Sequence, residues 1–239
     1  MRILFALLFF LAQACYAQQY NFKHYNEVEL KSDFFYDIDQ NSEGILYIAS
    51  SKGLLIYDGI DFKLLNESDS LIDEFVSTIF IDSEDHVWIA YYKGGVSKIE
   101  NNIIQHYCVD CYVNDIVELD NQKIIITTDE ETYQISNNQI KPTSEFENVN
   151  KIQLLSEQQK LHLTKDRRLL FLDQSNSEQL IQDSVSFFSC AIDGYPMAVV
   201  RQDQISIYNP RSSGLPKREM TMSLDELNIN SDITSLLMM

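Results

Sequence analysis

The segment NSEGILYIA, residues 41–49, recurs as DSEDHVWIA, residues 82–90, at a shift of 41 residues. Both copies place a polar turn before an apolar run with one aromatic residue, Tyr47 in the first copy and Trp88 in the second. A lysine and a glycine follow each run, as Lys52-Gly53 and Lys93-Gly94. Agreement of turn, aromatic residue and glycine in one register indicates a structural repeat.

Weaker copies of the same pattern follow at residues 115–135, 151–172 and 187–208. Each has three apolar segments rich in β-branched and aromatic residues, separated by polar turns, at a spacing of about 36 to 41 residues. A period of this length that consists of short strands is typical of β-propeller blades. One four-stranded sheet cannot bury both of its faces, whereas sheets stacked around an axis bury each other.

The sequence therefore predicts an all-β fold, a β-propeller of four-stranded antiparallel blades in an incomplete ring. We expect about five complete blades, and the start of a sixth from residue 231, where SDITSLLMM is similar to an innermost strand. The expected blades cover residues 32–66, 75–107, 113–141, 149–182 and 185–223 within one domain, 18–239. We also expect residues 21–26 to supply an outer strand to the last blade, and the chain to be part of a longer protein.

The first 17 residues are typical of a secretory signal peptide. A basic Met1-Arg2 precedes an apolar run at residues 3–11, which is too short to span a bilayer, and small residues lead to Ala17. A short buried helix, an uncleaved anchor, or a lipoprotein site at Cys15 are the alternatives. The signal peptide predicts a protein exported across the inner membrane, periplasmic or associated with the cell envelope.

The charge of the chain argues against nucleic acid as a partner. The sequence has 36 acidic and 18 basic residues, a formal net charge of −18. Such a surface repels phosphate backbones.

The repeats resemble the two-component regulator propeller repeat, whose pattern DxxGxLWIGT…GLxxYD corresponds to NSEGILYIASSKGLLIYDG and SEDHVWIAYYKGGVSKIEN. The resemblance covers residues 18 to about 107 well and is thin afterwards, where each copy lacks the tryptophan. It implies the periplasmic sensor of a membrane-spanning regulator that senses glycan fragments, with a histidine kinase or DNA-binding output. It also implies further blades and a membrane helix outside this segment, and a homodimer of the full-length protein. The segment itself has no kinase, receiver or helix-turn-helix motif.

Basic residues recur in the expected loop between the second and third strands of four blades. Such loops share one face of a propeller with the connections between blades. These side chains could therefore form a basic surface around the opening of the central channel, suited to a uronate or sulfated sugar. Two tyrosines beside Lys93 could add a stacking surface. The alternative is that these are ordinary solvated turns. The candidate ligand-binding residues are Lys52, Tyr91, Tyr92, Lys93, Lys165, Arg167 and Arg201.

Cys108 and Cys111 lie in the connection between the second and third blades. A local disulfide or two unpaired thiols both fit this position, whereas a metal site needs a second pair of ligands at the right spacing. We expect no metal site and no cofactor.

Three classes of function fit these features. The first is a non-catalytic sensor that binds a ligand such as an oligosaccharide and changes the packing of a dimer. The second is a structural or surface-assembly propeller associated with secretion. The third is a propeller lyase or hydrolase with carboxylates in the central channel, which ranks last because the innermost strands show no clear acid–base pair.

Overall fold

The computed structural model describes residues 23–26, 30–107, 111–119, 122–136, 138–156, 159–173, 175, 177–190, 197–201, 204–209 and 216–223. The predicted signal peptide, the start of a sixth blade from residue 231 and Cys108 lie outside these residues. Within them, no helix is both long and apolar enough to cross a membrane.

The described residues form five antiparallel sheets of four strands each, as predicted, and each sheet is a meander of consecutive strands. Blade 1 contains β1 (Phe35–Gln40), β2 (Leu46–Ser50), β3 (Gly53–Tyr57) and β4 (Phe62–Leu65). Blade 2 contains β5 (Val76–Ile81), β6 (Val87–Tyr91), β7 (Val96–Glu100) and β8 (Ile103–Tyr107). Blade 3 contains β9 (Val113–Leu119), β10 (Lys123–Thr128), β11 (Thr132–Ser136) and β12 (Gln139–Pro142). Blade 4 contains β13 (Val149–Ser156), β14 (Gln159–Thr164), β15 (Leu169–Leu172) and β16 (Glu178–Gln182). Blade 5 contains β17 (Phe187–Cys190), β18 (Met197–Arg201), β19 (Gln204–Asn209) and β20 (Lys217–Ser223).

The first strand of each of the first four blades is innermost, since β1, β5, β9 and β13 contact one another in sequence. In each of these strands, the second residue has no partner on the neighbouring strand of its sheet, which is a β-bulge. The interruption falls between Phe35 and Asp37, Val76 and Thr78, Val113 and Asp115, and Val149 and Lys151. A bulge at one repeat position bends each innermost strand in the same way, which identifies the four sheets as copies of one unit.

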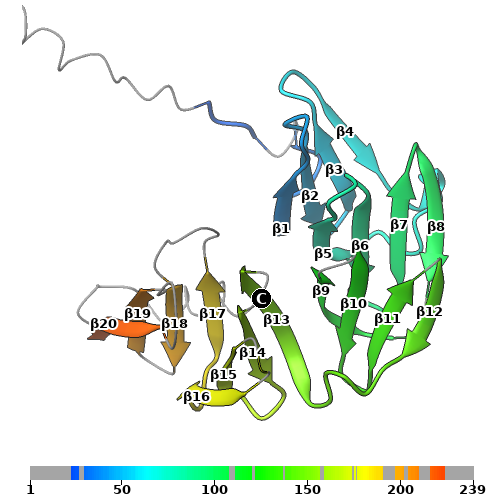
Figure 1. Ribbon diagram of the computed structural model, residues 1–239. Coiled ribbons are helices and arrows are strands. Elements are labelled where there is room, and N and C mark those ends of the chain that lie inside the picture. Colours follow the sequence, from blue (N-terminus) through cyan, green and yellow to red (C-terminus); the bar gives the residue numbers. More distant parts are fainter. Residues whose placement is uncertain are drawn as a thin grey trace, which may run out of the picture.

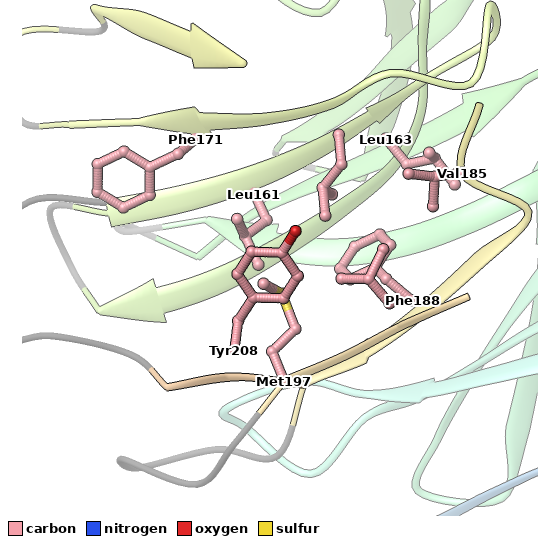
Figure 2. Close-up of a cluster of buried hydrophobic side chains, with 9 residues drawn as sticks. Leu161, Leu163, Phe171, Val185, Phe188, Met197 and Tyr208 are labelled. Carbon is pink, nitrogen blue, oxygen red and sulfur yellow. The ribbon is translucent and has the colours of Figure 1, made fainter. Parts of the chain in front are cut away.

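The hydrophobic core is divided among the four interfaces between consecutive sheets. Separate clusters of buried side chains join blades 1 and 2, 2 and 3, 3 and 4, and 4 and 5. Figure 2 shows the last of these, in which Leu161 and Leu163 of β14 face Phe188, Met197 and Tyr208 of blade 5. Burial between sheets, not within one sheet, is the interaction that holds the fold together.

Tyr47 and Trp88 occupy equivalent places in neighbouring blades. Tyr47 pairs with Asp39 and Ile56, and Trp88 pairs with Phe80 and Lys98, both in the second strand of their sheets. Tyr47 belongs to the cluster between blades 1 and 2, and Trp88 to the cluster between blades 2 and 3. Both rings therefore pack between blades. Ile125 and Leu161 take the same place in blades 3 and 4, so aliphatic side chains replace the missing aromatic ones there.

The repeat shift of 41 residues holds through the second strands and becomes 42 in the third strands. Ala49 pairs with Leu54, whereas Ala90 pairs with Val96. The loop of blade 2 therefore has one extra residue, and Gly53 corresponds to Gly95, not to Gly94 as the sequence alignment suggests. Gly53, Gly94 and Gly95 all have positive φ, which glycine adopts without strain.

The five described sheets follow one another along an arc that does not close into a ring (Figure 1). Residues 23–26 form no strand. Tyr25 instead packs on the outer part of blade 1, with its hydroxyl 2.6 Å from that of Tyr57 and its ring against Phe62. The blade that would close the ring is not among the described residues, so the expectation that this segment completes it stays a prediction.

Candidate functional site

In a four-stranded meander, the loop between the second and third strands lies at the same end of the strands as the connection to the next blade. Backbone hydrogen bonds join the two along the arc: the amides of Ser51, Tyr92 and Lys165 donate to Phe34, Phe75 and Asn148, which precede the first strands of their own blades. The amide of Gly95 in turn donates to the carbonyl oxygen of Cys111, at the entry to blade 3, at 2.8 Å. The predicted basic residues therefore lie on this connection face.

Tyr91 is not part of that surface. Its side chain is 1% exposed within the cluster between blades 1 and 2, and its hydroxyl donates to Ser97 Oγ at 3.0 Å. Burial raises the pKa of its phenol. Tyr91 is the last residue of β6, and its ring points between the sheets, so the prediction that it forms a stacking surface is wrong.

Tyr92 does lie on the surface, with 62% of the residue exposed. Its ring stacks on Phe75 at a centroid distance of 4.7 Å, and Phe75 contacts Tyr36 on its other side at 4.5 Å. The aromatic partner of Tyr92 is therefore Phe75, which reaches it from the connection between blades 1 and 2.

The predicted cations are spread along the arc, and four of the five contact groups of this chain. Lys93 Nζ lies 2.7 Å from Asp73, whose hydrogen bond and charge raise the pKa of the lysine. Lys165 Nζ donates to the backbone oxygen of Asp129, Arg167 donates to Val185 O and Ser186 Oγ, and Arg201 lies 3.5 Å from Asp183. Lys52 is exposed. Binding of an anionic sugar by Lys93, Lys165, Arg167 or Arg201 would compete with these contacts.

Lys165 also borders a cavity of about 530 Å³ between blades 3 and 4. Its other charged lining residues are Glu130, Glu131 and Glu147, so the cavity is acidic on balance. An acidic lining disfavours a uronate or sulfate group at this position. That ligand class stays a prediction without support from this cavity.

Cys111 lies at the start of blade 3, and its predicted partner, Cys108, lies outside the described residues, so the disulfide stays a prediction. Within the described part of the chain, no three His, Cys, Asp or Glu side chains are grouped to hold a metal ion.

The innermost strands carry a set of carboxylates that the sequence did not single out. Asp37 and Asp39 of β1 accept the amides of Ile79 and Ile81 of β5, each at 2.9 Å, and Asp115 of β9 accepts the amide of Ile152 at 2.9 Å. An innermost strand has a partner on one side only, so half of its amides point away from its own sheet. These aspartates satisfy such amides in the next blade.

Burial is the main influence on the pKa of two of these aspartates, Asp115 and Asp37. Desolvation raises the pKa of Asp115 from 3.8 to about 7, although the nearby ammonium group of Lys151 lowers it. Desolvation also raises the pKa of Asp37, against the opposing hydrogen bond from Ile79. The only sequence signal was the alternation of acidic residues in YDID, which is also what a solvated edge strand would show.

No protein-family model matches the sequence, and a search of curated proteins gives no match. Among solved structures, the chain is similar to the extracellular domain of BT3049 from B. thetaiotaomicron, described as a hybrid two component system, with a TM-score of 0.62 and 15% identity. That match covers 82% of this chain and 29% of the other.

Two further structures support the same architecture. The extracellular domain of BT4673 from B. thetaiotaomicron, described as a one component system, matches with a TM-score of 0.57 and 14% identity, over 77% of this chain and 28% of that one. The WD40 β-propeller domain of Doa1 matches with a TM-score of 0.52 and 11% identity, over 80% and 68%. At these identities the similarity establishes the β-propeller fold, and this chain spans less than a third of the two bacterial domains.

Proposed function

We propose that this chain is part of the extracytoplasmic, ligand-sensing propeller of a signal transduction protein. The observation that carries the proposal is the match of its five-blade arc to the extracellular domain of BT3049, over 82% of the chain. The repeat resemblance at residues 41–59 and 83–101 points to the same class of protein. In this proposal the ligand is a glycan fragment, and the output region and a dimer partner belong to the longer protein.

The carboxylates on the innermost strands support binding without catalysis. A glycosidase needs one carboxyl group that donates a proton and a second that acts as base or nucleophile. Asp37, Asp39 and Asp115 instead accept backbone amides of the neighbouring blade. A carboxylate that holds two blades together is poorly placed to act on a substrate.

The test is calorimetric titration of the protein with neutral and acidic oligosaccharides, followed by chromatography of the recovered sugar. The proposal predicts that at least one glycan binds and is recovered intact. Recovery of shortened sugar would show an enzyme, and the absence of binding to any glycan would contradict a glycan sensor.

A further inference from the structure

A second cavity, of about 710 Å³, lies between blades 2 and 3 and contains none of the residues predicted from the sequence. One wall comes from the β5–β6 turn and from β7, and the other from β9, β10 and β11. Its volume falls in the range of small-molecule sites in proteins, roughly 300–1,000 Å³. Because both blades line it, an occupant would contact both.

The blade 2 wall is held rigidly by one buried carboxylate. Asp82, 8% exposed, accepts hydrogen bonds from Trp88 Nε1 at 2.8 Å and from the backbone amide of His86 at 2.9 Å, and its Oδ2 lies 3.0 Å from His86 Nδ1. This arrangement fixes the imidazole with Nε2 directed toward Glu100, at 3.5 Å. A wall whose side chains are already ordered loses little conformational entropy when a ligand binds.

The two lysines of the cavity are already paired with glutamates, and one of its carboxylates is held by neutral donors. Lys98, 7% exposed, forms an ion pair with Glu100 at 2.8 Å, and Lys123 pairs with Glu145 at 2.6 Å. Glu118 accepts the amide and hydroxyl of Ser83, at 2.7 and 2.8 Å. Asp82, Glu84 and Glu118 also line the cavity, so its lining is acidic on balance and disfavours an anion.

The cavity also presents uncharged hydrogen-bonding groups, of which Asn138 already accepts the Tyr107 hydroxyl at 3.4 Å. Gln134, Ser136 and Asn138 of blade 3 line the cavity opposite His86, and Gln122 Nε2 reaches Glu84 of blade 2 at 3.1 Å. Amide and hydroxyl groups both donate and accept, as the hydroxyl groups of a polyol do.

We propose that the cavity between blades 2 and 3 binds a neutral, polyhydroxylated molecule, such as the end of an uncharged oligosaccharide, through hydrogen bonds to both blades. The proposal rests on the proposed ligand-sensing function and assigns it a place and a ligand class. An occupant that bridges the blades would favour one packing of their interface, which is what a sensor needs in order to transmit binding.

The protein contains its own probe, because Trp88 lines this cavity and is the only tryptophan of the chain. We would titrate the protein with short cello-, xylo-, malto- and manno-oligosaccharides, and with oligogalacturonate as the charged counterpart, and follow tryptophan fluorescence. We expect a neutral sugar to change the Trp88 emission and oligogalacturonate to leave it unchanged. Gln134→Ala should weaken the affinity about fivefold or more, the size of one hydrogen bond.

Gln179→Ala, on an exposed strand of blade 4, is the matched control and should leave the affinity unchanged. Equal melting temperatures of both variants and the wild type would exclude a folding defect. Glycan binding in the calorimeter with unchanged Trp88 emission, or with equal affinity in Gln134→Ala, would overturn this site and leave the sensor function standing. A preference for the charged sugar, or no response to any neutral sugar, would overturn the site as well.

Discussion

At the scale of single residues, Gly53 shows most directly how the sequence sets the turn between the second and third strands. Its φ is +134°, and a Cβ at this position would lie 1.9 Å from the carbonyl oxygen of Leu65. Both the backbone conformation and the space therefore require glycine. The Lys-Gly pair that marked the repeat is thus a structural signal.

Gly53→Ala should destabilise the protein by about 3 kcal/mol or more, since backbone strain and a steric clash add. Gly59→Ala is the control, because Gly59 has a φ of +95° with no atom within 4 Å of its hypothetical Cβ. That variant should lose only about 1 to 2 kcal/mol. Urea unfolding of both variants measures the difference, and equal losses would show that the approach to Leu65 is relaxed in solution.

His162 is a buried titratable residue that makes stability depend on pH. It is 4% exposed, its Nε2 has no hydrogen-bond partner among the described residues, and burial lowers its pKa from 6.5 to about 4. The unfolded chain binds this proton more readily than the folded one. The free energy of unfolding is therefore unaffected by His162 above pH 6.5, and it decreases as the pH falls toward 4 and the unfolded chain takes up the proton.

His162→Leu should raise stability at pH 7 by about 1 to 2 kcal/mol, because it removes a buried nitrogen without a partner. Its advantage over the wild type should grow as the pH falls from 6.5 to 4. Chemical denaturation across this range measures the difference between the two proteins. An advantage that stays constant with pH would show that His162 titrates normally in the fold.

At the scale of elements, the innermost strands are joined by carboxylates that cross from one blade to the next. Asp115 accepts the amide of Ile152, and its pKa is raised to about 7 by burial. A raised carboxyl pKa means that the folded protein holds the proton more tightly. The stability linked to Asp115 is therefore full below about pH 4 and is lost as the pH rises toward 7.

Asp115→Asn keeps an acceptor for Ile152 and removes the titration. The stability of the wild type relative to Asp115→Asn should therefore decrease as the pH rises from about 4 to 7. Asp115→Ala should be less stable than the asparagine variant at every pH, since it leaves the amide unpaired. A relative stability that does not change with pH would contradict the burial of this carboxyl group.

The elements themselves were predictable, because the signal for each lay within a few residues. The run KIIITT became β10, and the expected blade at residues 75–107 contains β5 to β8, from Val76 to Tyr107. The direction of individual side chains was harder to predict. All five residues of β6 are buried, so periodicity could not show that Tyr91 points inward.

The candidate site was less predictable, because its partners come from distant segments. Lys93 meets Asp73 across the connection to blade 2, and Arg201 meets Asp183 across the entry to blade 5. The cavity between blades 2 and 3 joins residues up to about 56 positions apart, from Asp82 to Asn138. Pairings of this kind follow from the packing of blades, which composition and spacing do not reveal.

At the scale of the whole molecule, stability and the proposed function both depend on the interfaces between blades. Four hydrophobic clusters fill these interfaces, and polar contacts such as Ser83 to Glu118 close their edges. The arc thus behaves as a series of nearest-neighbour contacts. A ligand between two blades would act on one contact of this series.

Amide hydrogen exchange at Ile79, Ile81 and Ile152 tests the packing of blade on blade most directly. These amides lie on the free edge of their own sheets and donate to Asp37, Asp39 and Asp115 of the preceding blade. We predict that they exchange as slowly as amides within the sheets, and that Asp37→Ala speeds exchange at Ile79 but not at Ile152. Fast exchange at all three in the folded wild-type protein would contradict a propeller in which each blade is joined to the next.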